Sequence, residues 1–288
     1  MITTETKQQI CEKLNEYVLH IGSQNKAANS LKGVSAGTLS QMQNNNWELI
    51  KDSMWRNVAT QILRVDNSWQ AVETRSFTEL TDLLSDAQMH SGVFGVTGDA
   101  GTGKSFAIKK YVDNNKEAYL LSCAEYWNRK YFLSELLTAM GRDYSGMTVA
   151  EMMQEAVSRL KKVDRPIIIM DEADKLSDQV LYFFITLYNQ LEEHCAIILC
   201  ATDHLAKRIK RGLKLNKKGY KEIYSRMGKK FIELEDVGST DVMQVCMANG
   251  INDRQTIKEI YEDCEGDLRR VKRKIHALRM ANNPLNAN

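Results

Sequence analysis

The stretch Gly98–Ser105 holds residues whose types and spacing can bind a phosphate chain. It fits the pattern G-x-x-x-x-G-K-[ST] at every fixed position, and its members are Gly98, Asp99, Ala100, Gly101, Thr102, Gly103, Lys104 and Ser105. Glycines let backbone N–H groups close around an anion, and a following helix N-terminus adds a partial positive charge. Lys104 can reach the β- and γ-phosphates, and the Ser105 hydroxyl can ligate Mg²⁺. The pattern predicts a nucleotide site, which we extend to Phe106; the alternative is a glycine-rich turn with a chance lysine.

Two acids, Asp171 and Glu172, supply the second half of this chemistry. They follow Pro166–Met170, a continuous apolar run typical of a strand buried on both faces of a parallel sheet. Open α/β sheets bind their ligands at the carboxyl ends of such strands. We therefore expect Asp171 to hold Mg²⁺ through water and Glu172 to polarise the attacking water. The alternative is a strand with a solvated acidic cap, but the phosphate loop in the same chain favours a core that hydrolyses ATP or GTP.

Strand-like and helix-like segments alternate around both motifs and must position them. The expected strands are 93–97, 118–122, 166–170, 196–201 and 231–234. The expected helices are 76–89, 106–111, 128–140, 148–163 and 177–193. Such alternation predicts a parallel sheet that is covered by helices on both faces. Residues 239–288 have a helical pattern throughout and indicate a small all-α lid.

The composition sets outer limits on the function. The 288 residues suffice for one large domain or two modest ones. Lys and Arg number 39 and Asp and Glu number 37, so the net charge of +2 does not by itself indicate a nucleic acid partner. The six cysteines form no C-x-x-C pair, which favours buried free thiols. No apolar run approaches the about 18–20 residues that cross a bilayer, and there is no signal-peptide pattern, so we expect a cytoplasmic protein without membrane contact.

Residues 1–66 are expected to form a small helical module, which a helix from Trp47 to Leu63 closes. Within it, the layout of residues 23–42 resembles a helix-turn-helix of the phage-repressor kind, in which Gly33 makes the turn and Ser35 caps the second helix. In this interpretation Ser35, Thr38 and Gln41 lie on the side that enters the major groove of DNA. The alternative is a helical module that binds protein, since such turns also occur outside DNA-binding proteins.

The order of the parts resembles that of the AAA+ ATPases over about residues 76–281. The resemblance implies ATP as the nucleotide and adds three positions to the catalytic set. Asp203, or else Thr202, falls at the sensor-1 position, which commonly holds Asn. Arg226 falls where the family carries an arginine finger, and Arg269 matches the sensor-2 arginine of the lid. A cation from a neighbouring subunit can balance charge on the γ-phosphate, so this match implies oligomerisation; an ordinary surface arginine is the alternative for Arg226.

Short matches extend the resemblance to transposon-encoded AAA+ target-selection ATPases of the phage Mu B type. They lie in Gly33–Ser40 of the helix-turn-helix, in Val72–Thr74 of the linker, in Asp171–Asp174 and in Ser225-Arg226. The resemblance implies an ATPase that assembles on double-stranded DNA, as a ring or a helical filament, and directs a transposase to a target. The alternatives are a replication initiator or helicase loader, and a DNA-binding regulator that uses nucleotide as a switch.

Two basic stretches are candidates for contacts with DNA phosphates. One runs over residues 207–221 and includes Lys207, Lys210 and Lys214. In the other, Tyr126–Tyr131, Arg129 and Lys130 are interleaved with aromatic residues, and the resembling family turns this region toward its central pore. Basic side chains that neutralise phosphates gain affinity by releasing counterions. A run of charges is also typical of a solvated face or loop, so both interpretations stay open.

The sequence therefore predicts an α/β protein in the form of an AAA+ P-loop NTPase. A parallel sheet and a small α-helical lid follow an all-α helix-turn-helix module. The expected limits are 1–66 for the module, 67–75 for a linker, 76–236 for the nucleotide-binding core and 237–288 for the lid.

Overall fold

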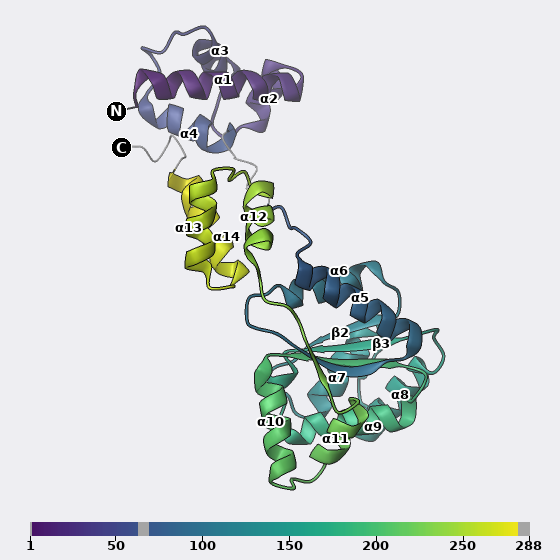
Figure 1. Ribbon diagram of the computed structural model, residues 1–288. Helices are drawn as coiled ribbons and strands as arrows, with labels where there is room; N and C mark the ends of the chain where they lie inside the picture. The colour runs from purple at the N-terminus through teal and green to yellow at the C-terminus, as the bar shows by residue number, and fades with distance from the viewer. Residues whose placement is uncertain (1, 63–68, 282–288) are drawn as a thin grey trace. The chain divides into compact units, whose positions relative to one another are not determined.

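A computed structural model describes residues 2–62 and 69–281 of the chain (Figure 1). The chain divides into two compact units, one of residues 1–70 with 273–288 and the other of residues 71–272. The predicted limits of the helical module, the linker and the lid all run partly over residues 63–68 or 282–288, which lie outside the described residues.

The first unit contains four helices among its described N-terminal residues. They are α1 (Thr4–Ile21), α2 (Gln24–Ser30), α3 (Ala36–Gln43) and α4 (Asp52–Ile62). All four contribute to one apolar core, in which Leu14, Leu39 and Trp55 are fully buried. We expected the last helix to begin at Trp47, and this was wrong. Residues 47–50 form a turn instead, and the Trp47 indole ring packs edge-on against Trp55 with 5.6 Å between the ring centroids.

The second unit is built on a sheet of five parallel strands within the described residues. The strands are β1 (Val93–Thr97), β2 (Ala118–Ser122), β3 (Ile167–Asp171), β4 (Ala196–Ala201) and β5 (Phe231–Glu233). Their order across the sheet is β2-β3-β4-β1-β5, and every neighbouring pair is parallel. The carboxyl ends of all the strands therefore meet at one edge of the sheet. The predicted strands are confirmed to within one residue at each end.

Helices cover both faces of this sheet (Figure 1). On one face lie α5 (Arg75–His90) and α6 (Lys104–Asn114). The other face is covered by α7 (Arg129–Ala139), α8 (Val149–Leu160), α9 (Asp178–Leu191), α10 (Asp203–Lys214) and α11 (Tyr220–Arg226). The predicted fold class, an α/β P-loop core with a parallel sheet, is confirmed. Helices α10 and α11 were not predicted, since the basic run from residue 207 to 221 left a loop open as an alternative.

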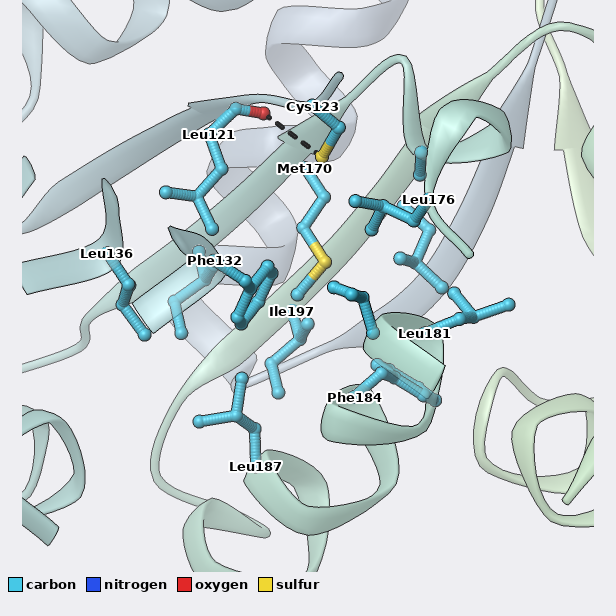
Figure 2. Packing of buried hydrophobic residues seen from close by; sticks show 14 of the residues in the cluster. Leu121, Cys123, Phe132, Leu136, Met170, Leu176, Leu181, Phe184, Leu187 and Ile197 are labelled. Carbon is cyan, nitrogen blue, oxygen red and sulfur yellow. Dashed lines mark hydrogen bonds between the residues drawn. The ribbon is translucent and has the colours of Figure 1, made fainter. Parts of the chain in front are cut away.

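The alternation of side chains along the strands explains why the central strands are apolar throughout. On β3, Ile168 and Met170 enter the core under α7–α11, whereas Ile167 and Ile169 enter the core under α5 and α6. Figure 2 shows the first of these cores, where Met170 packs among leucines and two phenylalanines, Phe132 and Phe184. Successive strand residues point to opposite faces, so a strand covered on both sides needs apolar side chains at every position.

In the part of the chain that the structure describes, three helices follow β5: α12 (Ser239–Ala248), α13 (Arg254–Cys264) and α14 (Leu268–Ala281). Helices α12 and α13 pack on each other through buried side chains that include Val242, Val245 and Ile260. The six cysteines are free and buried, as their spacing predicted. Among the described residues, no helix is both long enough and apolar enough to span a bilayer.

Candidate nucleotide-binding site

The phosphate loop lies between β1 and α6, in the strand–turn–helix context that its pattern requires. Gly101 and Gly103 have φ angles of +89° and +93°, values that side chains of L-residues disfavour. The Thr102 side chain is buried and its hydroxyl donates to the Asp99 carbonyl at 3.0 Å, which ties the loop to itself. The loop therefore has the backbone conformation that turns N–H groups toward a bound anion.

Lys104, the first residue of α6, folds back over this loop. Its ammonium donates to the carbonyl oxygens of Gly98 and Asp99, both at 2.6 Å. Burial lowers the pKa of Lys104, while the nearby Asp171 carboxylate acts to raise it and Arg269 to lower it. A partly desolvated cation interacts more strongly with phosphate than a fully hydrated one does. The contact of Lys104 with the β- and γ-phosphates stays a prediction.

Ser105 and Asp171 come together at the carboxyl edge of the sheet. Asp171 is the last residue of β3, and its buried carboxylate accepts a hydrogen bond from the Glu172 N–H at 3.0 Å. Burial raises the pKa of Asp171, while the nearby Ser105 hydroxyl and the Glu172 N–H act to lower it. The strand β4 separates β3 from β1, so only the fold brings these two predicted Mg²⁺ ligands within reach of one another.

Glu172 occupies a strained backbone position directly after β3. Its φ and ψ are 56° and 37°, in the left-handed region, and it begins the 3₁₀ turn Ala173–Lys175. Its carboxylate accepts a hydrogen bond from the Lys175 ammonium at 2.6 Å. Non-glycine residues in this region cost about 1–3 kcal/mol and persist where surrounding structure fixes them. We call residues 171–175 the acidic turn.

Thr202 and Asp203, the two candidates for the sensor-1 position, point in different directions. The Thr202 hydroxyl donates to the Asp174 carboxylate at 2.9 Å and so faces the acidic turn. Asp203 begins α10 and forms an ion pair with Lys207 on the next turn of that helix. The hydrogen bond from Lys207 lowers the pKa of Asp203. The geometry favours Thr202 over Asp203 for a role near the acidic turn.

The segment before α14 lies against the phosphate loop. The Leu268 N–H donates to the Gly101 carbonyl at 3.0 Å, and a Cβ atom placed on Gly101 would collide with the Asp267 carboxylate. Asp267 in turn accepts a hydrogen bond from the Arg269 N–H at 2.8 Å. Arg269, the predicted sensor-2 residue, is thereby held at the mouth of the loop, close enough to affect the pKa of Lys104.

Arg226 lies at the end of α11 and contacts α9 of its own subunit. Its guanidinium donates to the Asn189 side-chain oxygen at 3.0 and 2.8 Å and lies 5.3 Å from the centroid of the Tyr188 ring. A carboxylate oxygen of Glu222 lies 3.7 Å away. These contacts fix Arg226 on one outer surface of the core, away from the residues grouped around Lys104. A role across a subunit boundary stays a prediction.

The predicted DNA contacts lie in three separate places. Ser35 accepts a hydrogen bond from the Thr38 N–H at 3.1 Å and caps α3, as expected, and Gln41 lies on the same helix. Arg129 and Lys130 begin α7 and are exposed, beside Tyr126, whose side chain is 72% exposed. Lys207, Lys210 and Lys214 are on α10. Their roles in DNA binding stay predictions, and Lys207 already has Asp203 as a partner.

The donor set fits a magnesium nucleotide. Among the described residues, no group of three or more His, Cys, Asp or Glu side chains could hold a metal by itself. Mg²⁺ usually keeps several waters and takes one or two protein oxygens together with substrate phosphates, which matches Ser105 and Asp171. Phe106, half exposed beside the Phe77 ring, lies one residue further along α6.

A cavity of about 510 Å³ near α5 and α12 is a poor site for phosphate. Its lining includes five carboxylates and one guanidinium, from Glu73, Glu79, Asp82, Glu235, Asp241 and Arg75. Negative charge of this density would repel a triphosphate. The phosphate loop therefore remains the candidate site.

Three residues near the acidic turn were missed by reasoning from the sequence. They are Arg208, Asp178 and Tyr220, which form a network on α9, α10 and α11. Arg208 was grouped with its basic neighbours as a candidate for phosphate contacts. The signal that could have separated it is the spacing of Leu205, Ile209 and Leu213, because apolar residues four apart mark the inner side of a helix.

The chain is similar in sequence to known proteins. Residues 86–209 match the AAA domain family. Over 251 residues the chain is 25% identical to the Mu-like prophage FluMu DNA transposition protein B of Haemophilus influenzae, covering 82% of this chain and 85% of that protein.

Two solved structures were also compared. The Orc1 protein of Aeropyrum pernix, solved in complex with DNA, has a TM-score of 0.51 at 14% identity, over 77% of this chain and 64% of that one. NtrX from Brucella abortus has a TM-score of 0.47 at 11% identity, over 88% of this chain and 59% of that one. The chain thus spans less than two thirds of either structure, and the likeness to Orc1 concerns the fold alone.

Proposed function

We propose, on the premise that this chain belongs to the AAA+ family of P-loop ATPases and resembles transposition protein B of a Mu-like prophage, that it is an ATP-dependent DNA-binding ATPase of transposition. In this proposal it hydrolyses ATP with Mg²⁺, self-associates on double-stranded DNA and directs a transposase to target DNA. The name of the relative supports a part in transposition, and the AAA domain supports nucleotide binding.

The observation that carries the ATPase part is the closeness of Ser105 and Lys104 to Asp171, which is near enough for each of them to act on the pKa of its carboxyl. The phosphate loop and the acidic turn, the two halves of a hydrolytic site, therefore approach each other across β4. Lys104 and the loop N–H groups bind the phosphates, and Ser105 and Asp171 hold Mg²⁺. Glu172, next in the chain, orients water for attack on the γ-phosphorus. When bound, the metal neutralises charge on the β- and γ-phosphate oxygens.

A phosphate-release assay with Mg²⁺ and ATP, with and without duplex DNA, tests this part. The variant Glu172→Gln should keep ATP affinity and lose about 10²–10⁴-fold in turnover, since it removes only the group that orients water. The control is Glu125→Gln. It removes an exposed carboxylate that, like Glu172, acts to raise the pKa of Lys175. Equal turnover of Glu172→Gln and the parent would remove Glu172 from its proposed role.

The proposed DNA contacts come from exposed basic residues on α7 and α10, with the helix-turn-helix adding contacts from the first unit. With a net charge of only +2, one subunit should bind duplex weakly, and assembly should multiply the phosphates that are neutralised. Binding should therefore depend on ATP, weaken steeply with salt and depend little on base sequence. Fluorescence anisotropy over a salt series, with imaging of DNA and a non-hydrolysable ATP analogue, tests assembly.

Self-association also predicts how variants of Arg226 should behave. If it acts on a neighbouring subunit, Arg226→Ala should bind ATP without hydrolysing it, and mixing it with Lys104→Ala should restore some turnover. Rescue arises where an intact pocket meets an intact arginine. A defect without rescue would place Arg226 in a role within its own subunit. A transposase that is recovered in pull-downs and is stimulated by the chain would support the role in transposition. A replicative helicase recovered instead would support a role in helicase loading.

A further inference from the structure

We infer that Arg208 is a positioning residue for ATP hydrolysis, which holds the acidic turn and so fixes the direction of Glu172. The inference rests on the proposed ATPase function and assigns a role to a residue of the basic run that does not point to solvent. Its basis is a set of hydrogen bonds that connect α10 to the last part of the turn and to the residue that follows it.

The Arg208 guanidinium binds main-chain atoms of the acidic turn and of the residue that follows it. Its Nη1 donates to the Leu176 carbonyl at 2.6 Å and to the Asp174 carbonyl at 3.3 Å. These carbonyls lie two and four residues after Glu172. A planar guanidinium can bridge several acceptors in one fixed geometry, which a lysine ammonium on a flexible stem cannot do.

Two side chains hold Arg208 itself in place. Its Nε donates to the Tyr220 hydroxyl at 3.1 Å, and its Nη2 pairs with the Asp178 carboxylate, which also accepts from the Tyr220 hydroxyl at 2.7 Å. The Arg208 side chain is 26% exposed. Burial acts to lower its pKa, but the hydrogen bonds with Tyr220 and Asp178 leave that pKa above the usual value. The guanidinium is therefore a fixed cation between α9, α10 and α11.

The basic run of α10 thus divides into two sides. Lys207 and Lys210 are exposed, whereas Arg208, between them in sequence, turns toward the buried side with Leu205 and Ile209. Successive residues of a helix are about 100° apart around its axis, so adjacent basic residues serve different surfaces. Arg208 is accordingly available to the acidic turn and not to a ligand on the outer face of α10.

Glu172 explains why such a clamp matters. Its left-handed backbone is one that a glutamate leaves readily unless neighbouring contacts fix it. The hydrogen bond from Thr202 holds the Asp174 side chain, and Arg208 holds the Asp174 and Leu176 carbonyls. Without Arg208 the turn keeps its sequence but loses its main-chain anchors, and the Glu172 carboxylate would no longer point consistently at the water.

The test compares Arg208→Lys with Arg159→Lys. Arg159 is a matched control because its side chain is also 26% exposed and is paired with Glu117, which precedes β2 at the opposite edge of the sheet. Binding of a non-hydrolysable ATP analogue counts the intact sites, and kcat is expressed per intact site. We expect Arg208→Lys to lower kcat about 10–100-fold with KM and analogue affinity within about twofold, and Arg159→Lys to leave kcat unchanged.

A second variant keeps the test decisive if Arg208→Lys fails to fold. Tyr220→Phe removes one hydroxyl and retains the packing, and it should lower kcat per intact site in the same direction by a smaller factor. If both variants fold, the inference is overturned when both have the kcat of the parent. If only one folds, it is overturned when that one has the kcat of the parent. Absence of phosphate release from the parent protein would instead overturn the proposed function, so the two failures are distinguishable.

Discussion

The phosphate loop and the acidic turn follow two strands of the same sheet, β1 and β3, but different parts of the chain hold them. The loop is fixed largely by its own residues: two glycines with positive φ angles, the Thr102 hydroxyl bond and the fold-back of Lys104. The acidic turn has one side-chain hydrogen bond of its own, from Lys175 to Glu172, and is otherwise fixed from outside, by Thr202 and Arg208. A local motif can therefore specify the first half of the site, while the second half needs helices that come later in the sequence.

This difference implies separate consequences for binding and for turnover. Changes in the loop should act on nucleotide affinity, because its N–H groups and Lys104 contact the phosphates. Changes around the acidic turn should act on turnover, because they move Glu172 and leave the phosphate contacts in place. Variants that affect both quantities equally would contradict the comparison.

The largest effect is expected from Lys104→Ala. The loss of a charge-assisted contact with two phosphates should weaken ATP binding by about 100-fold or more, at about 1.5–3 kcal/mol for each hydrogen bond to a charged group. Titration with a fluorescent ATP analogue measures this. Lys109→Ala, an exposed lysine of the same helix, is the control and should bind as the parent does. Parent-like affinity in Lys104→Ala would place the phosphates elsewhere.

How much the sequence could reveal follows the same division. The phosphate loop, Asp171 and Glu172 could be located from spacing alone, since each fixed residue lies within a short stretch next to a strand. The closeness of Ser105 and Asp171 could be expected only from the parallel sheet, because 66 positions separate the two residues. No local sequence pattern predicts the hydrogen bond between Thr202 and Asp174, because that contact depends on how β4 and β3 pair.

The basic run shows why the remainder could not be predicted. Its lysines and arginines mask the apolar spacing of Leu205 and Ile209, so α10 was left as a possible loop. A count of charges also does not distinguish Arg208 from Lys210, although Arg208 is directed inward and Lys210 is exposed. The start of α4 was misjudged for a related reason, because Trp47 has helical spacing but packs on Trp55 from a turn.

A smaller effect on binding is expected from Gly101→Ala, measured against Gly146→Ala. Both glycines have positive φ, +89° and +75°, so both substitutions cost about 1–2 kcal/mol of backbone strain. At Gly101 a Cβ would also collide with Asp267, whereas nothing lies within 4 Å of it at Gly146. In denaturant unfolding, Gly101→Ala should therefore lose more stability than Gly146→Ala. In ATP titrations, only Gly101→Ala should bind ATP more weakly than the parent. Equal losses would mean that the Asp267 contact does not constrain the loop.

On the acidic turn, Thr202→Val and Asp203→Asn distinguish the two sensor-1 candidates. Thr202→Val keeps the shape and removes the hydrogen bond to Asp174, which should lower kcat by about tenfold with ATP affinity unchanged. Asp203→Asn weakens only an ion pair with Lys207 within α10 and should leave kcat close to that of the parent. If Asp203→Asn has the larger effect on kcat, the sensor-1 role belongs to Asp203.

The smallest effect concerns stability and its dependence on pH, through Asp171→Asn in the nucleotide-free protein. An aspartate has a pKa of 3.8 in the unfolded chain, and burial raises the pKa of Asp171 in the folded protein. The folded state therefore binds the proton more tightly than the unfolded state does. Ionising Asp171 lowers stability as the pH rises through the folded pKa, and this cost is fully present above that pKa.

An asparagine carries no charge but still accepts through its side-chain oxygen, so the hydrogen bond from the Glu172 N–H can persist. We expect Asp171→Asn to have a higher Tm than the parent above the folded pKa of Asp171, and this difference should shrink as the pH falls through that pKa toward 3.8. The control Asp164→Asn removes a carboxylate whose side chain is 93% exposed and should show no such trend. A Tm gain that is constant with pH, or a loss of Tm at high pH, would mean that the contacts of the ionised carboxylate outweigh the cost of its burial, and the acidic turn would then be stabilised by Asp171 itself.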